Sequence, residues 1–518
     1  MSEDAAMIGM GINEIAQAVS GTVVPVYGTG ADPNVVVTSV ADDSRQVLPG
    51  CAFVAIAGER VDGHAFVAAA AKSGAVVALV EHEVPDAPIP QIVVDNSVQA
   101  LGALARHNID RRRELGTDFS VIGITGSVGK TTTKDLLHAL LSDLGPTVAP
   151  VGSFNNNIGL PLTALQVNEH TRFLIAEMGA NHVGEIANLT TIAPPDVAVV
   201  LKVGTAHLGE FGSVELIARA KSEIVRGLLP DGIAVLNADD AHVADMAALA
   251  PGRVIWFGEH AEDGNEGESR VGLNADAIGE DAADRPTFKM REYAAQEGGR
   301  GKESEVTLAI SGGHNVYNAL AAASVAHHYG MTLDRIAAVL RTVRVISPHR
   351  MAISRVDVAG TGFTLIDDSF NANPDSMKAG LDALAAWRGD GVREHPRVAV
   401  LGAMLELGPE EMALHRTVGA YAVNSGVEAV IAVGSDADGH LDALAHALAQ
   451  GADERVRASA PDASCSVQWV HTVDEAERSV DAFVAGRPRS VVLVKGSHAS
   501  GLGSLIERWS ARTGETAV

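Results

Sequence analysis

The sequence has 518 residues, of which 47% are hydrophobic and 20% charged, and its formal net charge is -26. Single hydrophobic cores stop growing near about 250 to 300 residues, so we expect two or three domains. The acidic balance excludes a nucleic-acid binder, because affinity for a phosphate backbone needs a dense cationic surface.

The N-terminal segment does not resemble a targeting signal, and the cysteines do not form a metal-binding pattern. The opening MSEDAAMIGM has acids where a secretory signal has bases, and no apolar run of about 18 residues follows. We expect a cytoplasmic protein without membrane insertion. The two cysteines, Cys51 and Cys465, lie far apart and in no CxxC pattern, so we expect two buried, reduced thiols.

The pattern of apolar strands and helices divides the chain into three blocks. The first, 1–117, alternates strands at 51–56 and 76–80 with an alanine-rich helix at 65–73, which is typical of a small α/β domain. The charged run 110–114 ends a helix and leads into a strand at 119–124, which opens the second block, 118–345.

The second and third blocks both read as parallel sheets covered by helices. Buried-looking strands at 173–176, 197–201 and 233–236 predict the central sheet, and the polar stretch 260–302 predicts exposed loop with short edge strands. The third block, 346–518, has strands at 363–366, 398–401, 429–433 and 490–494. The predicted fold class is therefore α/β with three domains, the last doubly wound and Rossmann-like.

A glycine-rich loop between a strand and a helix is the strongest chemical signal. It consists of Gly126, Ser127, Val128, Gly129, Lys130, Thr131 and Thr132. Glycines allow backbone N–H groups to surround phosphate oxygens, the lysine reaches the terminal phosphates and the threonine hydroxyl can bind magnesium. The loop is shorter than GxxxxGK[ST], since position 124 is Ile, but its context predicts a site for ATP and Mg²⁺.

The loop ITGSVGKTTTK resembles the ATP loop of the Mur ligase family, whose relatives include folylpolyglutamate synthetase. The resemblance covers nearly the whole chain, through DSRQVLPGCAFVAIAGERVDGHAF, SFNNNIGLPLT, AEMGANHVGEI, GTAHLGEFGSVELIARAKSEI, GGHNVYNALAAA, PHRM, IDDSFNANPDSM, LGAMLELG and VLVKGSHASG. AEMGAN and DDSFNANPDSM are most similar to the members that join D-alanyl-D-alanine to UDP-N-acetylmuramoyl-tripeptide. The DNPR motif of the members that add the third amino acid is missing.

The resemblance implies an ATP-dependent ligase that converts a carboxylate into an acyl phosphate, with magnesium held by Thr131, Glu177, His207 and Lys221. It also implies that Lys221 is carbamylated, because its family counterpart carries a carbamate. Taken alone, Glu177 would be a solvated loop acid and His207 a structural histidine. Lys221 would be an exposed lysine of an amphipathic helix, 214–228.

The remaining site residues are likewise implied by the resemblance. Asn315 and Asn318 would lie near adenine, although helix capping is the alternative. Arg350 and Asp368 would reach the ATP phosphates when the last domain closes. Ser44, Arg45 and the turn Asp62-Gly63-His64 would hold the uridine nucleotide, and a turn with ordinary capping is the alternative. The other substrate residues would be Asn155, Asn156 and Asn157 for the muramoyl-peptide, and Asn371 and Asn373 for the dipeptide.

Two departures and two rival functions stay open at this point. The family often has an acid where this chain has Ala403 and an arginine where it has His498, which leaves the dipeptide contacts undecided. One rival is another amide ligase of the family, adding a single amino acid or a glutamate to folate. The other is a nucleotide-regulated binding module. We expect a monomer that takes small-molecule substrates and no nucleic acid.

Overall fold

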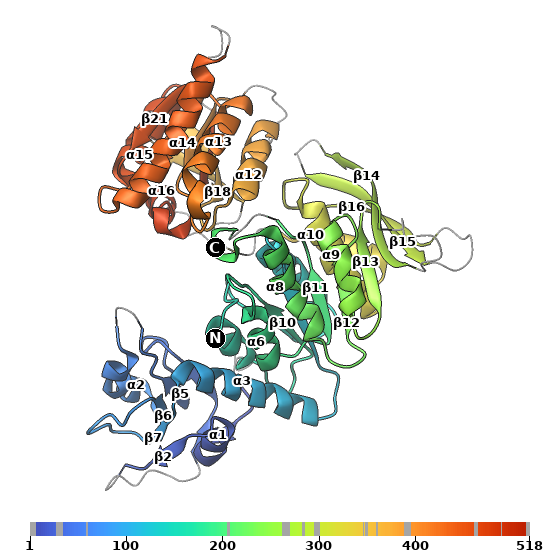
Figure 1. The fold of residues 1–518 in the computed structure, drawn as a ribbon, viewed down its shortest axis with the longest axis vertical. Helices are drawn as coiled ribbons and strands as arrows, with labels where there is room; N and C mark the ends of the chain where they lie inside the picture. Colours follow the sequence, from blue (N-terminus) through green and yellow to red (C-terminus); the bar gives the residue numbers. More distant parts are fainter. Residues whose placement is uncertain are drawn as a thin grey trace.

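The computed structural model describes residues 7–26, 35–58, 61–204, 208–261, 270–281, 285–294, 301–344, 347, 351–358, 361–387, 395–459, 465–487 and 489–513. Within these residues three large sheets follow one another along the chain, with five, nine and six strands, and a two-stranded sheet joins β1 (Met10–Gly11) to β3 (Val36–Val37). The three sheets lie in three units arranged in chain order, blue, green to yellow, and orange to red in Figure 1. The predicted α/β class is confirmed.

The first sheet has the order β2-β7-β6-β5-β4 and lies in the N-terminal unit. Its strands are β2 (Thr22–Val24), β4 (Ser39–Ala41), β5 (Cys51–Val54), β6 (Ala75–Val80) and β7 (Gln91–Val93), accompanied by α1 (Ile12–Ala18) and α2 (Val67–Ser73). All neighbours are parallel except β2 and β7. The predicted strands and helix are confirmed to within two residues, apart from a 3-10 turn, Gly63–Phe66, at the start of the helix.

Helix α3 (Ser97–Glu114) joins the first unit to the second. Asn96 caps its start by accepting a hydrogen bond from the Gln99 amide, 2.9 Å. In its last turn the buried Arg112 donates to the carbonyls of Thr171, 2.8 Å, and Asp118, 2.9 Å. The charged run that the sequence predicts as a helix end is therefore also an anchor on the central unit.

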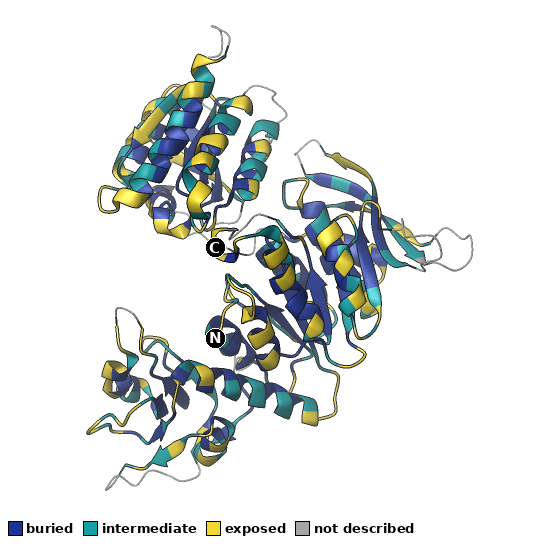
Figure 2. Ribbon diagram, viewed as in Figure 1, coloured by how far each residue is buried: buried dark blue, intermediate teal, exposed yellow. Residues whose placement is uncertain are grey.

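The central sheet has the order β16-β15-β14-β13-β12-β11-β8-β10-β9 and is parallel from β9 to β14. Its strands are β8 (Ser120–Thr125), β9 (Thr147–Val148), β10 (Phe173–Glu177), β11 (Val197–Val200), β12 (Ile233–Asn237), β13 (Val254–Gly258), β14 (Val271–Glu280), β15 (Pro286–Ala294) and β16 (Glu303–Thr307). Helices α4 (Lys130–Ser142), α10 (Asn315–His328) and α11 (Leu333–Leu340) cover one face, and α5 (Gly159–Ala164), α6 (Glu185–Ile192) and α8 (Val214–Arg226) cover the other. Figure 2 shows the strands buried between helices whose outer faces are exposed.

The prediction of loop and short edge strands for 260–302 is wrong where the structure describes that stretch. β14 has ten residues and β15 nine, and they pair antiparallel. Leu273, Ala275, Phe288 and Met290 alternate along them and are buried in the same core as α10. The alternation of buried and exposed residues is hard to recognise in the sequence, because Gly, Asp and Glu are frequent at the solvent-facing positions. The composition of the stretch therefore indicated a loop rather than strands.

The third sheet has the order β17-β18-β22-β19-β20-β21, parallel except for β17. Its strands are β17 (Ala352–Val358), β18 (Thr361–Asp368), β19 (Arg397–Leu401), β20 (Ala429–Val433), β21 (Ser466–Val470) and β22 (Val491–Lys495). Helices α12 (Pro374–Ala386), α13 (Glu411–Asn424) and α14 (Gly439–Arg457) pack on one face, and α15 (Val473–Val484) and α16 (Gly503–Thr513) on the other. This is the predicted doubly wound arrangement.

Cys51 is buried as expected, but Cys465 is only partly buried, so that expectation is wrong for the second thiol. It lies next to β21, the edge strand, where one side of the sheet lacks a neighbouring strand. Each helix in the described ranges is too short or too polar to cross a lipid bilayer.

Candidate active site

The predicted phosphate loop leads from β8 into α4. Gly129 lies at the helix start with φ +85°, in the left-handed region that favours glycine, and a Cβ there would meet the side chain of Asn318. The Ser127 amide donates to the Lys202 carbonyl, 2.8 Å, which ties the loop to the end of β11. Lys130 donates to the Gly126 carbonyl, 2.7 Å. The loop thus has the strand, turn and helix start that a phosphate site requires.

Glu177 is the last residue of β10, fully buried, and not the solvated loop acid of the alternative interpretation. Its Oε1 accepts hydrogen bonds from Asn155, 2.9 Å, and Ser153, 3.0 Å, and a longer one of 3.4 Å from Thr131. Its Oε2 is buried and has no hydrogen-bond partner among the residues that the structure describes. A buried carboxylate oxygen left without a partner is costly, and a bound cation would satisfy it.

Lys221 lies on α8 but points inward, with only 3% of its surface exposed, so the exposed-lysine interpretation is wrong. No hydrogen bond or ion pair joins it to a residue within the described ranges. Burial lowers the pKa of Lys221 well below its ordinary value, and the nearby Lys130 ammonium lowers it further. A lowered pKa favours the neutral amine, which is the nucleophilic form.

Thr131, Glu177 and Lys221 line one cavity of about 1320 Å³. The side-chain oxygens of Thr131 and Glu177 suit Mg²⁺, which prefers hard ligands and keeps positions for substrate phosphates. No group of three or more His, Cys, Asp or Glu side chains able to hold a metal occurs in the described part of the chain. The fourth predicted ligand, His207, lies outside the described residues.

Asn315 and Asn318 lie in the first turn of α10, both buried, and line the same cavity. Asn315 donates to the Ser311 carbonyl, 2.7 Å, and Asn318 donates to Asn315, 2.8 Å. Asn318 also accepts from Thr133 on α4, 3.3 Å. Neither side chain caps α10, so the alternative capping role is wrong, and the pair connects α10 to the phosphate-loop helix.

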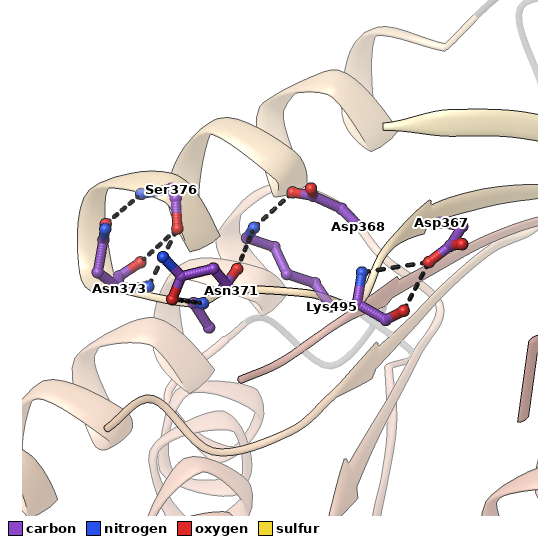
Figure 3. A network of polar contacts seen from close by, with 8 residues as sticks. Asp367, Asp368, Asn371, Asn373, Ser376 and Lys495 are labelled. Atoms are coloured by element: carbon purple, nitrogen blue, oxygen red, sulfur yellow. Dashed lines mark hydrogen bonds and ion pairs between the residues drawn. The ribbon is translucent and has the colours of Figure 1, made fainter. Parts of the chain in front are cut away.

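The C-terminal unit contributes the facing wall of the cavity. Asp368 ends β18 and Lys495 ends β22, directly opposite in register, and their side chains form a buried ion pair (Figure 3). Lys495 also donates to the Asn371 carbonyl, 3.1 Å. The predicted Asp368 thus lies in the cavity, whereas Arg350 lies outside the described residues.

All of the predicted asparagines of the second and third units line the cavity: Asn155, Asn156, Asn157, Asn371 and Asn373. Asn373 caps α12, accepting from the Ser376 amide at 2.9 Å, and Asn371 accepts from the Ala372 amide, also at 2.9 Å (Figure 3). Asn156 accepts from the amides of Ile158, 3.2 Å, and Gly159, 2.9 Å. These local bonds fix the amide groups against the backbone.

Ser44 and Arg45 do not line this cavity. They lie in the N-terminal unit, where Arg45 is 87% exposed at its side chain and forms a fork with Asp43 at 2.6 to 3.1 Å. The fork lowers the pKa of Asp43 to about 2. The nearby His64 is buried between the Asp62 carboxylate, 2.6 Å, and the Glu81 amide, 2.8 Å, and its ring stacks on that of His82.

Sequence reasoning missed Lys495 and Ser153, although both belong to segments that carry the family resemblance. Lys495 stands at the carboxyl end of a parallel strand, the edge where ligands gather in open α/β sheets, and that position was the available signal. Ser153 has no such signal, because its contact with Glu177 joins residues that are 24 positions apart.

Comparisons with known proteins agree with this geometry. Residues 36–108, 124–326 and 349–498 match the domains described as Mur ligase family, catalytic domain; Mur ligase middle domain; and Mur ligase, glutamate ligase domain. UDP-N-acetylmuramoyl-tripeptide--D-alanyl-D-alanine ligase of Mycobacterium tuberculosis is 39% identical, over 97% of this chain and 98% of the relative.

Solved structures show the same likeness. The crystal structure of MurF from Acinetobacter baumannii has a TM-score of 0.77 and 31% identity, covering 98% of this chain and 99% of that one. MurF ligase from Thermotoga maritima in complex with ADP has a TM-score of 0.69 and 26% identity, covering 91% and 97%. On the strength of these full-length matches, the chain belongs to the Mur ligase family.

Proposed function

We propose that this protein joins D-alanyl-D-alanine to UDP-N-acetylmuramoyl-tripeptide at the expense of ATP, a step of peptidoglycan biosynthesis. The observation that carries the proposal is the cavity in which the phosphate loop and the half-satisfied Glu177 face the Asp368 and Lys495 pair. The full-length relatives named for this reaction supply the substrates. Products are UDP-N-acetylmuramoyl-pentapeptide, ADP and phosphate.

The chemistry begins with the γ-phosphate of ATP, held at the loop 126–132. The terminal carboxylate of the tripeptide attacks it, giving an acyl phosphate and ADP. The dipeptide amine then attacks the acyl carbon, loses a proton and expels inorganic phosphate. A free carboxylate resists amine attack, so phosphorylation supplies the leaving group, and the protein's part is positioning and charge stabilisation.

The charged and polar residues of the cavity have different roles in this chemistry. Lys130 and Lys495 supply cations for the phosphates, while Thr131 and Glu177 supply oxygens for magnesium. Magnesium, when bound, screens the carboxylate from the γ-phosphate as the two anions approach. Asn315 and Asn318 adjoin the phosphate loop from α10, which suits the adenosine end of ATP. We assign Arg350 to the phosphates and His207 to the metal by their family counterparts alone.

We assign Lys221 the role of a carbamylated ligand. Its neutral amine would attack carbon dioxide, forming an N–C bond and releasing a proton, and the product would be an anionic oxygen donor. Burial without a polar partner among the described residues, together with the lowered pKa, supports this assignment. The anionic carbamate would also be attracted to the Lys130 ammonium.

The three units would divide the substrates among them. Residues 1–117 would bind the uridine nucleotide through Ser44 and Arg45, and residues 118–345 would bind ATP and, at Asn155 to Asn157, the muramoyl-peptide. Residues 346–518 would receive the dipeptide near Asn371 and Asn373. We propose that the protein acts as a monomer, and we place its action in the cytoplasm, where ATP and the nucleotide precursor occur.

A binding module that hydrolyses ATP slowly is less consistent with the site. Such a nucleotide-dependent switch does not require a buried carboxylate and a buried lysine, here Glu177 and Lys221, next to the phosphate loop. An enzyme adding a single amino acid is disfavoured by the NANPDSM segment. Both rivals predict a different dependence of ADP formation on the substrates.

The test is a steady-state assay of ADP formation with each substrate omitted in turn. We expect ADP only when UDP-N-acetylmuramoyl-tripeptide and D-alanyl-D-alanine are both present, and a product heavier by one dipeptide less water. Single amino acids and L-alanyl-L-alanine serve as matched controls. ADP formation without the dipeptide, or with a single amino acid in its place, would contradict the proposal.

A further inference from the structure

Two buried side chains of opposite charge follow one another on α4, behind the phosphate loop. Lys134 is 2% exposed and Asp135 is 7% exposed, and their side chains form an ion pair of 2.6 Å. Consecutive residues of a helix point about 100° apart and do not normally face each other. Both side chains therefore bend toward one another to form the pair, and Ser347 hydrogen-bonds to each of them.

Ser347 lies in the connection between α11 and β17, which leads from the central unit to the C-terminal unit. Its hydroxyl donates to Asp135 Oδ2, 2.6 Å, and Lys134 Nζ donates to Ser347 Oγ, 3.3 Å. Lys134, Asp135 and Ser347 thus form a closed buried network, here named the linker triad. It ties the phosphate-loop helix to the chain that carries the third unit.

The same lysine also holds a third segment. Lys134 Nζ donates to the carbonyls of Pro150, 2.9 Å, and Gly152, 3.2 Å. These belong to residues 149–157, here named the acceptor loop. Val151 is 78% exposed and Phe154 53% exposed, so apolar burial holds this part of the loop only weakly. Its position depends on polar contacts, and Lys134 provides two of them.

The acceptor loop in turn sets the surroundings of Glu177. Ser153 and Asn155 both donate to Glu177 Oε1, and Ser153 also contacts Thr131, 3.0 Å. A shift at Gly152 is one residue away from Ser153. Hydrogen bonds, together with the peptide link between Gly152 and Ser153, therefore connect the interunit connection through Lys134 to the carboxylate proposed to hold magnesium.

The linker triad is poorly explained by stability alone. Burial raises the pKa of Asp135, which reflects the cost of keeping its charge away from water. A buried ion pair generally stabilises a fold no better than well-packed apolar side chains of the same volume. Helix α4, the acceptor loop and the interunit connection all meet at this ion pair. A role in fixing the positions of these three segments relative to one another explains the pair better.

We propose that Lys134, Asp135 and Ser347 are positioning residues that set the acceptor loop and the interunit connection relative to the phosphate loop. Asp135 and Ser347 also line the cavity, and we assign the linker triad no contact with the reacting atoms. It acts by holding Ser153 and Asn155 against Glu177 and by fixing where the C-terminal unit leaves the central sheet. The proposal rests on the proposed function for its kinetic consequence but not for its structural one.

The structural test is hydrogen exchange of the full chain without substrates. Ser347→Ala removes one hydroxyl from the linker triad, and Ser347→Thr retains it. Ser324→Ala is the matched control, because Ser324 is a buried serine whose hydroxyl has no hydrogen-bond partner within the described residues. We expect amides in 150–157 to exchange about tenfold faster in Ser347→Ala, while Ser347→Thr and Ser324→Ala match the parent. Unchanged exchange in Ser347→Ala would overturn the proposal.

The kinetic test separates positioning from a merely structural role. We expect Ser347→Ala to raise KM for the tripeptide precursor and for the dipeptide about tenfold and to leave KM for ATP within about twofold. A loss of folded enzyme would lower kcat and leave every KM unchanged, which would overturn the proposal. Lys134→Met combined with Ser347→Ala should be no worse than Lys134→Met alone, because both break the same network. Should Lys134→Met fail to fold, the two Ser347 variants decide the question.

These two tests fail in different ways. If the protein used other substrates, the parent itself would form no pentapeptide product, yet the exchange comparison would still judge the linker triad. If the parent made the product but the exchange pattern of Ser347→Ala matched the parent, the proposed function would stand and the positioning role of the linker triad would be refuted.

Discussion

The backbone amide of Gly209 donates a hydrogen bond of 3.1 Å to the carbonyl of Glu406, joining the central unit to the C-terminal unit. Gly209 belongs to α7 (Leu208–Phe211), and Glu406 lies in a turn after β19 with φ +61°. Asn181 adds a second contact, 3.4 Å to the Glu406 carboxylate. A non-glycine residue in the left-handed region costs about 1 kcal/mol, so the turn keeps a strained backbone at this junction.

Gly209→Ala should separate the two units at this junction. A Cβ at Gly408, which has φ +70°, would lie 2.7 Å from Gly209 Cα, and a Cβ at Gly209 would run into the Gly408 backbone. We expect about a tenfold loss of kcat/KM for the dipeptide with a fold that stays intact. Gly439→Ala is the control, since a Cβ there has open space. Equal kinetics for the two variants would mean that this junction has no part in catalysis.

Arg45→Ala should weaken binding of the uridine precursor alone. The side chain is exposed and is not part of the cavity lining, so its loss removes a remote binding contact and leaves the chemical step unchanged. We expect KM for the precursor to rise about tenfold with KM for D-alanyl-D-alanine unchanged. Arg285→Ala is the control, because Arg285 forms a similar, partly buried fork with Asp281. An equal rise for both substrates would argue against a uridine role.

Lys221→Ala should abolish ligation, with a loss of at least about a hundredfold, because it removes a proposed anionic ligand from the reacting centre. Short-chain carboxylates should restore part of the rate by placing a free oxygen ligand in the vacated space. The measurement is the ligase rate with and without carboxylate at fixed ionic strength, so that screening does not imitate rescue. Lys72→Ala, an exposed lysine of α2, should show neither loss nor rescue. A Lys221→Ala enzyme of parental activity would refute the carbamate.

His415 should make the C-terminal unit sensitive to acid. Its Nε2 accepts from the Met404 amide, 2.9 Å, and its Nδ1 donates to the Glu411 carbonyl, 2.7 Å, so the ring fits only when neutral. Burial lowers the pKa of His415 from 6.5 to about 4. The unfolded chain therefore binds the proton first, and the stability that this group contributes is complete above pH 6.5 and is lost as the pH falls toward 4. The shift corresponds to roughly 3 kcal/mol.

We expect His415→Gln to remove that part of the acid dependence. The free energy of unfolding would be measured by denaturant titration at several values of pH between 4 and 7 for the parent, His415→Gln and the exposed control His170→Gln. The parent and the control should lose stability more steeply than His415→Gln as the pH falls. Parallel loss in all three proteins would show that His415 does not titrate in this range.

Local sequence predicted the parts of the site that are built locally. The phosphate loop needs only a strand, a glycine turn and a helix start, all within residues 120–142, and each is where the pattern places it. Asn315 and Asn318 likewise open the predicted helix α10. The three parallel-sheet blocks could be predicted from short runs of apolar residues, because a strand that is buried on both faces is apolar along its whole length.

Contacts between distant segments could not be predicted in this way. A lysine in an amphipathic helix is compatible with either face, so the burial of Lys221 emerges only when α8 packs on the sheet. The pairing of Asp368 with Lys495 depends on the order of strands in the third sheet, which puts β22 beside β18. The half-satisfied carboxylate of Glu177 depends on a loop that approaches it from more than 20 residues away.

The most direct test of the proposed acyl-phosphate route is to follow an oxygen atom of the substrate carboxylate. UDP-N-acetylmuramoyl-tripeptide labelled with ¹⁸O in its terminal carboxylate would be incubated with ATP, D-alanyl-D-alanine and the enzyme, and the inorganic phosphate analysed by mass spectrometry. An acyl-phosphate route carries one labelled oxygen into each phosphate released, because the carboxylate oxygen that attacks the γ-phosphate leaves with it. We predict that label in the phosphate, and unlabelled phosphate alongside pentapeptide formation would contradict the account.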